Sequence, residues 1–432
     1  MNNYKLLASL AVFGELNENK KNIHDILAVF IMQIVKEDSL YTFTDSKIKV
    51  LLEEKYDFEI PIAVIRSSIK KTNHFKLQNH EYTLQDVKVL SQYDLAQHEQ
   101  QLEINSALIQ KLHKFIEVEK NVTLSVKEKR VIEEDFCNLI LDNSLGNGNS
   151  DLIGAFILKH ETDMEFIREM QKIREGVILY TGLKYTPNSN FNKSWSSKFT
   201  IYLNMEIIFH LSGLNGEIHK ELFYDFYDLV KDINRSKKLI SLKYFPDVKE
   251  EIEYFFSKAE KIINGHETLE PTNYAMKEIV QNCKNTTDII SMKFKFFSSL
   301  EKQGIFEEED IPDVTSGDNY KYNIDTESLQ EEAGKKLGDD DISNEIRTLN
   351  YLSIKRGNKD KNNFENIGCI LLSSKRKMLE IAQCDNIRES GGVPLVTTMN
   401  FLTTKLWFKL NKGLGGSDFP KAFSVITKAR LL

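Results

Sequence analysis

Cysteine, proline and glycine are scarce in this chain of 432 residues. The four cysteines lie far apart without a Cys-x-x-Cys pair, and the nine histidines show no zinc-ligand spacing. This argues against a disulfide-bonded or zinc-binding domain and favours reduced thiols in a cytoplasmic protein. With only 7 Pro and 20 Gly, the chain has neither a collagen-like nor a low-complexity composition.

Long apolar runs and phosphate-binding loops are also missing from the sequence. The apolar stretch at residues 26–35 is about half the length needed to span a bilayer, so we expect no membrane segment. There is no Walker loop, no Gly-rich dinucleotide turn and no Gly-x-Ser-x-Gly elbow. These absences argue against P-loop ATPases, Rossmann dinucleotide-binding proteins and α/β-hydrolases with a serine elbow.

Charge is abundant but unevenly distributed. The net charge of −7 argues against a generally basic nucleic-acid-binding surface. Residues 301–352 hold 5 Lys/Arg and 15 Asp/Glu, whereas residues 353–432 hold 14 Lys/Arg and 6 Asp/Glu. The acidic part could bind a divalent metal ion, and the basic part could hold a phosphate backbone. The alternative is that the acidic stretch 306–345 is a solvated, partly disordered insert.

The N-terminal region has the outline of a winged helix, which we place at residues 1–90. Apolar spacing, a Thr-Asp-Ser cap and Pro61 predict three helices and then a hairpin, at residues 23–37, 46–56, 61–72 and 75–84. The third helix carries Arg66, Lys70 and Lys71, which fits a helix that faces DNA. The alternative is that this module binds a protein partner or packs as a cap.

A helical connecting region is expected at residues 91–190, because charged segments with apolar residues at helical spacing dominate it. The polar stretch 186–197 reads as a linker. From 198 to 432, apolar strands at 200–204, 367–373 and 393–397 alternate with helices, which predicts an α/β domain with a parallel sheet covered on both faces.

Polar residues follow two of these strands, at the end where sites form in parallel sheets. Asn204 and Glu206 come after the first strand, and the Ser373-Ser374 pair comes after the second. Other carboxylates lie on predicted helices that could face this edge, namely Glu251, Glu345 and, close to it, Asp341. Clustered oxygen ligands suit Mg²⁺ or Mn²⁺, and such ions can promote phosphodiester cleavage.

Residues 198–432 resemble a PIN-like nuclease domain. The similarity is carried by the segments YLNMEIIF, VKEEIEYFF, NEIRTLNYLSIKRG and CILLSSKRKMLEIA. The resemblance implies a Rossmann-like fold, a Mg²⁺ or Mn²⁺ site, and RNA rather than DNA as the commoner substrate. It implies catalytic roles for Asn204, Glu206, Glu251 and Glu345, and metal binding by Glu206, Glu251, Asp341 and Glu345. In the basic part, Arg356, Lys375 and Arg376 are the residues we expect to contact nucleic acid.

The sequence departs from the PIN-like pattern at three positions. The expected first Asp is Asn204, whose amide oxygen can bind a metal ion but brings no negative charge. The third acid is Glu345, one methylene longer than Asp, and Lys375 stands where Asp or Asn is usual. The site is therefore either weak or inactive, or it carries a deliberate Asp-to-Asn change that traps an intact enzyme.

Two further interpretations stay open at this point. One is a non-catalytic scaffold that binds nucleic acid or protein through a degenerate PIN-like domain, with the acids serving as structural pairs. The other is a host-defence or toxin-like effector, a role in which PIN-like nucleases often occur.

Overall fold

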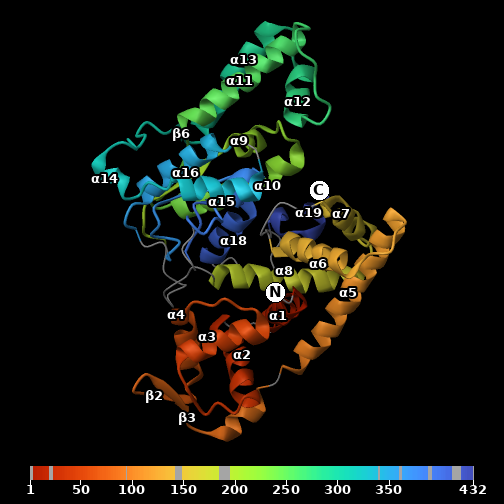
Figure 1. Ribbon diagram of the computed structural model, residues 1–432, viewed down its shortest axis with the longest axis vertical. Helices are drawn as coiled ribbons and strands as arrows, with labels where there is room; N and C mark the ends of the chain where they lie inside the picture. The colour runs from red at the N-terminus through yellow and green to blue at the C-terminus, as the bar shows by residue number, and fades with distance from the viewer. Residues whose placement is uncertain are drawn as a thin grey trace. The chain divides into compact units, whose positions relative to one another are not determined.

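The computed structural model describes residues 3–18, 23–93, 95–141, 148–183, 195–338, 341–359, 362–387, 392–410 and 420–431. The chain divides into two compact units, one of residues 1–193 with 411–432 and one of residues 194–410. Figure 1 labels their helices and strands. The boundary falls inside the stretch 186–197 that reads as a linker in the sequence.

The first unit is mainly helical. Its elements are α1 (Asn3–Glu18), α2 (Ile23–Glu37), β1 (Thr42–Phe43), α3 (Asp45–Tyr56), α4 (Ile62–Thr72), β2 (Phe75–Gln78), β3 (Glu81–Leu84), a 3-10 helix η1 (Val87–Gln92), α5 (Ala96–Lys120), α6 (Val126–Leu141), α7 (Ser150–Lys159), α8 (Met164–Leu183), a second 3-10 helix η2 (Lys421–Phe423) and α19 (Val425–Ala429).

Helices α2, α3 and α4 and the hairpin β2–β3 lie where the sequence pattern places three helices and a hairpin. The Thr44 side chain caps α3 by accepting from the Lys47 backbone nitrogen at 3.2 Å. Strand β1 adds to the hairpin, so the sheet is antiparallel with the order β1-β3-β2. The winged-helix resemblance itself remains a prediction.

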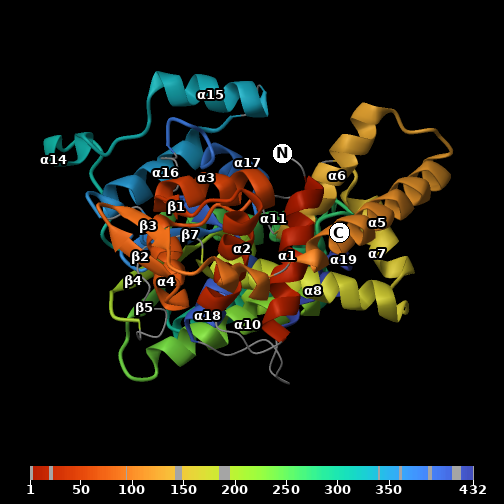
Figure 2. The ribbon, with the colours of Figure 1, turned by 90° about the horizontal axis from the view of Figure 1, so that it is seen from below.

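Helices α1 and α8 pack closely enough that glycine is required at their crossing (Figure 2). A Cβ atom added at Gly176 would overlap the Leu10 backbone carbonyl, and one at Gly14 would overlap the Lys172 carbonyl oxygen. These two glycines therefore set the distance between the helices.

The C-terminal residues belong to the first unit, which corrects the expectation that the α/β domain extends to residue 432. Helix α19 packs against α7. The buried Arg174 side chain donates to the carbonyl oxygens of Phe423 and Ile140 at 3.2 and 3.1 Å. These bonds tie the end of the chain to α8 and α6.

The second unit contains β4 (Phe199–Leu203), α9 (Met205–Ser212), α10 (Glu217–Asn234), β5 (Ile240–Tyr244), α11 (Pro246–Ile263), α12 (Tyr274–Asn282), α13 (Thr286–Lys302), β6 (Ile305–Glu307), α14 (Gly317–Tyr320), α15 (Glu327–Leu337), α16 (Ser343–Arg356), β7 (Cys369–Leu372), α17 (Arg376–Ile381), β8 (Val396–Thr397) and α18 (Met399–Lys409).

The five strands form one parallel sheet with the order β6-β5-β4-β7-β8, which confirms an α/β fold. The sequence predicts three of these strands and misses two. Strand β5 carries Ser241 and Lys243, which obscure its apolar pattern, and β6 has only three residues with Phe306 exposed. The order reverses between β4 and β7, because the chain first adds β5 and β6 on one side and then crosses to the other.

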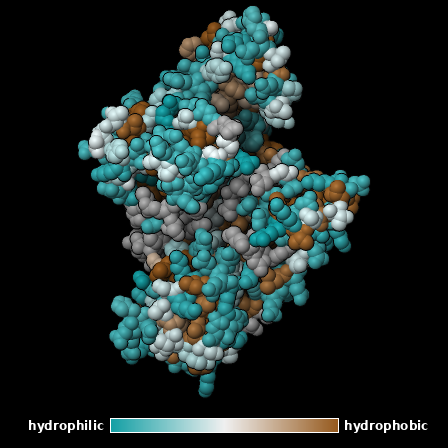
Figure 3. Space-filling model, viewed as in Figure 1, coloured by the Kyte–Doolittle hydropathy of each residue, from teal (hydrophilic) through white to brown (hydrophobic). Residues whose placement is uncertain are grey.

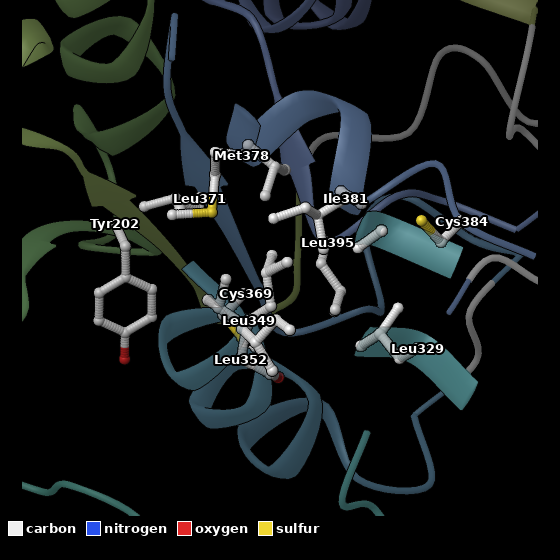
Figure 4. Close-up of a cluster of buried hydrophobic side chains, with 14 of the residues drawn as sticks. Tyr202, Leu329, Leu349, Leu352, Cys369, Leu371, Met378, Ile381, Cys384 and Leu395 are labelled. Atoms are coloured by element: carbon white, nitrogen blue, oxygen red, sulfur yellow. Dashed lines mark hydrogen bonds between the residues drawn. The ribbon is translucent and has the colours of Figure 1, made fainter. Parts of the chain in front are cut away.

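One core cluster covers a face of this sheet (Figure 4). Tyr202 and Leu371 of the strands belong to this cluster together with Leu349 of α16 and Met378 of α17. Leu203 and Leu372 are also buried and, because side chains alternate along a strand, they lie on the opposite face. Both faces are thus covered, as expected for a parallel sheet.

The acidic stretch 306–345 is only partly the solvated insert considered above. Helix α15 buries Leu329 and Ala333 in the core cluster. Glu308 is buried and accepts from the Tyr202 hydroxyl at 2.5 Å and the Lys243 ammonium at 3.1 Å. This part of the stretch is therefore structural, despite its charge.

The surface in Figure 3 is mostly hydrophilic, with hydrophobic residues scattered across it. The large exposed aromatic side chains of α11, α12 and α13 are Tyr254, Tyr274 and Phe294. Within the described ranges, none of the helices combines the length and the apolar character that crossing a bilayer requires.

Candidate active site at the carboxyl ends of β4 and β7

The site begins where β4 and β7 end side by side. The Asn204 backbone nitrogen donates to Leu372 O at 3.1 Å, which extends the pairing of the two strands by one residue. Asn204 then caps α9, its side-chain oxygen accepting from the Met205 nitrogen at 3.1 Å, while its amide nitrogen donates to Ser373 Oγ at 3.2 Å. The two strand ends are therefore joined by side-chain hydrogen bonds.

Glu206 takes part in the same network. Its Oε1 accepts from Ser373 Oγ at 2.6 Å and from the Ser374 backbone nitrogen at 2.9 Å. Its Oε2 is buried and has no hydrogen-bond partner in the described structure. A buried carboxylate oxygen without a partner is unfavourable, so this atom has capacity for a further ligand.

A cavity of about 330 Å³ opens beside this network. Asn204 and Lys375 line it from the strand ends, and α11 and α16 form its other walls. Four lining residues are acidic and two are basic, namely Asp247, Glu250, Glu251 and Glu345 against Arg347 and Lys375. The cavity therefore has a net negative charge, which attracts cations.

Two ion pairs cross the cavity walls. Lys375 Nζ lies 3.0 Å from Glu251 Oε2, and an Arg347 guanidinium nitrogen lies 3.0 Å from Asp247 Oδ2. Asp247 and Glu251 are four residues apart on α11, so they lie on the same side of this helix. Each basic residue of the cavity is thus already held by an acid of α11.

The cavity lies at the point where the strand order reverses. In open parallel sheets, ligands bind outside the carboxyl ends of the strands at this position, because the connections from the two adjacent strands run to opposite sides. Asn204 and Lys375 follow the two strands that flank the reversal. The fold therefore places this acidic cavity where a ligand is expected.

Two buried titratable side chains of this unit, His210 and Glu308, have a pKa below the usual value. Burial, and then the neighbouring His219, lowers the pKa of His210 in α9 to about 3, and the two rings stack at 4.4 Å. Burial alone would raise the pKa of Glu308, but hydrogen bonds from Tyr202, the Asp310 backbone and Lys243 outweigh it, so the pKa lies below its usual value. His210 is therefore neutral and Glu308 charged at neutral pH.

The structure brings several of the predicted catalytic and metal-binding residues together. Asn204, Glu251 and Glu345 line one cavity, and Glu206 is linked to it through Ser373. Asp341 is not among the lining residues; it is exposed and accepts from the Ser343 nitrogen at 3.0 Å, which lowers its pKa. Among the residues that the structure describes, no three His, Cys, Asp or Glu side chains form a group that could hold a metal ion.

Of the basic residues of the α/β unit that are predicted to contact nucleic acid, one is buried and one is exposed. Arg356 is buried and donates to the carbonyls of Cys369, Val393 and Pro394 at 2.9, 2.7 and 2.6 Å, so the expectation that it contacts nucleic acid is wrong. Its guanidinium is used to join α16 to the sheet. Arg376 is exposed and pairs with Glu380 at 2.6 Å.

In the first unit, the basic residues of α4 are at its surface. Arg66 pairs with Asp45, and Lys71 pairs with Asp25 at 3.2 Å, while Lys70 is exposed. Lys71 and Asp25 are both exposed, so their pair contributes little to stability, whereas Asp45 is largely covered.

Several residues that line the cavity are not among the site residues predicted from the sequence. Asp247 comes three residues after β5, so the strand-end signal that identified Asn204 would have found it had β5 been predicted. Arg347 and Tyr254 lie on helices next to predicted site residues, and Tyr254 is 67% exposed. Nothing in the sequence pattern distinguishes these two from ordinary surface residues.

Comparison of the chain with protein-family models, with curated proteins and with solved structures finds no match in any of the three.

Proposed function

We propose that the α/β unit is a PIN-like, divalent-metal-dependent nuclease that acts on RNA in preference to DNA and is weakened by Asn204. The observation that carries this proposal is the acidic cavity at the strand-order reversal. Its lining residue Asn204 is joined through Ser373 to Glu206, whose buried Oε2 has no hydrogen-bond partner among the described residues. The preference for RNA follows from the resemblance of residues 198–432 to PIN-like domains.

The side chains present suit Mg²⁺ or Mn²⁺ in chemical type, because carboxylate and amide oxygens are the ligands these ions prefer. Mg²⁺ commonly uses one or two protein carboxylates, several waters and the phosphate of its substrate. The lack of a group of three acids among the described residues is compatible with such a site. One or two of the carboxylates Glu206, Glu251 and Glu345 would hold the ion, and waters and the substrate would complete its ligands.

A bound ion of this kind would supply an activated water and stabilise the leaving oxygen of a phosphodiester. The protein's own side chains orient the carboxylate ligands and balance the charge of the cavity. Ser373 and the Ser374 nitrogen hold the Glu206 carboxylate in place through Oε1, which leaves Oε2 available. Lys375 and Arg347 supply the positive charge that a phosphate group requires in an otherwise acidic cavity.

Asn204 explains why we propose a weakened enzyme. Its oxygen already accepts the Met205 nitrogen as the cap of α9, and its amide nitrogen donates to Ser373. The amide therefore satisfies the local structure and adds no negative charge for a metal ion. An Asp at this position would add one full charge beside the cavity.

A second candidate function is a nucleic-acid-binding or protein-binding scaffold without catalysis. The ion pair between Lys375 and Glu251 favours it, because a lysine ammonium neutralises one of the acids that would hold the metal ion. On this account the carboxylates are structural, and added metal has no effect on the protein.

Cleavage assays separate the two functions. The wild type, Asn204→Asp and the double variant Asn204→Asp/Glu206→Gln are incubated with labelled single-stranded RNA and with DNA of the same sequence, in Mn²⁺ or in EDTA. We expect Asn204→Asp to cleave RNA faster than the wild type in Mn²⁺ only, and the double variant to lose this gain. Asn285→Asp, which changes another helix cap, is the matched control. No cleavage by any variant contradicts the nuclease proposal.

A further inference from the structure

Among the described residues that line the cavity at the ends of β4 and β7, Tyr254 is the single aromatic side chain. It lies on α11, three residues after Glu251 and seven after Asp247, so it shares their side of the helix. Its side chain is 67% exposed, and within the described structure it makes no hydrogen bond and no contact with another aromatic ring. Much of the ring is therefore free to contact a ligand in the cavity.

Two cations line the cavity from other elements, Arg347 from α16 and Lys375 from the end of β7. They pair with Asp247 and Glu251 of α11, at 3.0 Å in both cases. Both pairs are partly exposed, and each cation has further N–H groups that can donate to a phosphate oxygen. The cavity thus combines an aromatic surface for a base with two cations for the phosphates beside it.

The size of the cavity favours a nucleotide that has left a helical stack. Its volume of about 330 Å³ is at the lower end of the range for small-molecule sites, which suits a single nucleotide unit. In a duplex, neighbouring bases cover both faces of each base. Only a base that is unpaired and unstacked can therefore lie against the Tyr254 ring.

We propose that Tyr254 stacks on one unpaired base of a single-stranded RNA at this cavity, while Arg347 and Lys375 hold the adjacent phosphates. This inference rests on the proposed function, because it takes RNA as the ligand of the α/β unit. Every base has a π-face, so stacking on Tyr254 selects unpaired over duplex strands without reading the sequence. Tyr254 is thus a specificity-determining residue, which contacts the substrate away from the bond that is cleaved.

The charges of the cavity require stacking to supply much of the affinity. Four acids against two bases give no net attraction for a polyanion. Two phosphate contacts with a single strand predict that log K falls with log salt with a slope of only about −1.4. Binding to a basic surface elsewhere on the protein would not depend on Tyr254.

The test measures the binding of fluorescein-labelled RNA by anisotropy in EDTA, so that metal binding does not enter. The ligands are a short single strand, a duplex of the same sequence and an abasic strand of the same length. The proteins are the wild type, Tyr254→Ala, Tyr254→Trp and the matched control Tyr274→Ala. Tyr274 is a tyrosine of α12 that is 73% exposed and does not line the cavity. Melting curves establish that each variant is folded.

We expect Tyr254→Ala to bind the single strand about fivefold to 150-fold more weakly than the wild type, which is the effect of losing one stacked base. Tyr254→Trp should bind at least as tightly as the wild type, and Tyr274→Ala should bind equally well. The wild type should bind the duplex more weakly than the single strand. On the abasic strand, the difference between Tyr254→Ala and the wild type should disappear, because no base is present to stack.

Equal affinity of Tyr254→Ala and the wild type for the single strand overturns the inference, as does an equal loss on the abasic strand. A wild type that binds none of the three ligands, or a salt slope several times steeper than predicted, overturns it as well. The cleavage assay with Asn204→Asp decides the proposed function separately. If Asn204→Asp cleaves RNA and Tyr254→Ala binds like the wild type, only the inference fails; if Tyr254 stacks on RNA and no variant cleaves, only the nuclease proposal fails.

Discussion

Asn204→Asp is the substitution whose consequences the structure defines most fully. Asn204 is 4% exposed and its amide nitrogen donates to Ser373 Oγ at 3.2 Å. The Ser373 hydroxyl gives its proton to Glu206 at 2.6 Å. An aspartate would therefore place an oxygen lone pair against Ser373 Oγ, with no proton between them, and a second negative charge near Glu206.

Two unfavourable effects follow in the metal-free protein. A lost buried hydrogen bond costs about 1–3 kcal/mol, and the like charge at Glu206 increases that penalty. For a domain of this size, each 1 kcal/mol lowers Tm by roughly 2–4 °C. For a loss of about 2 kcal/mol, the middle of this range, we expect Asn204→Asp to melt about 4–8 °C below the wild type in EDTA.

Metal should reverse this loss, because the new carboxylate adds a full charge for a divalent ion. At a free Mn²⁺ concentration 100 times Kd, binding contributes about 2.7 kcal/mol, which is enough to restore the wild-type Tm. Scanning calorimetry of both proteins in EDTA and in Mn²⁺ measures the two effects, with Asn285→Asp as control. An equal metal response in the wild type and Asn204→Asp would refute this reasoning about Asn204.

Three further predictions concern stability. Gly176→Ala should lower the free energy of unfolding by about 1–3 kcal/mol despite the better helix propensity of alanine, because its Cβ overlaps the Leu10 carbonyl; urea unfolding measures this. Arg356→Met should lower the free energy of unfolding by about 3–5 kcal/mol, because three buried carbonyls lose their donor. The control Arg376→Met, at an exposed position, should change it by under about 1 kcal/mol in the same urea titration. Folding lowers the pKa of His210 from 6.5 to about 3. Between these two pH values the unfolded state binds more protons than the folded state. The free energy of unfolding should therefore fall as pH drops below 6.5, by up to about 1.4 kcal/mol per pH unit. In His210→Gln this slope should become shallower in urea titrations from pH 7 to about 4, and an unchanged slope would contradict the assignment.

Much of the α/β unit could be predicted from the sequence, because buried parallel strands are continuous apolar runs. Strands β4 and β7 have such runs, at Phe199–Leu203 and Cys369–Leu372, and both were found. Strand β5 alternates buried and more exposed residues, including Lys243, which pairs with Glu308 at the sheet edge. That contact joins residues 65 positions apart, so the local sequence does not reveal it.

The candidate site was predictable to a similar extent. Residues that follow a strand directly, such as Asn204, were placed correctly at the cavity because the end of a parallel strand fixes their position. Arg356 was misjudged because a sequence cannot distinguish an exposed arginine from one buried on backbone carbonyls. The return of residues 420–431 to the first unit involves contacts between residues remote in sequence, such as the bond from Arg174 to the Phe423 carbonyl, which the local pattern does not reveal.

Crystallography with Mn²⁺ tests the central claim most directly. Crystals of the wild type and of Asn204→Asp are soaked in Mn²⁺, and anomalous difference density is measured at the manganese edge. We predict a peak at the cavity between Glu206 and Glu251 in Asn204→Asp, with lower occupancy in the wild type. A protein that shows no peak in this cavity at saturating Mn²⁺, or a peak only elsewhere, would contradict the assignment of a metal-dependent nuclease site to the carboxyl ends of β4 and β7.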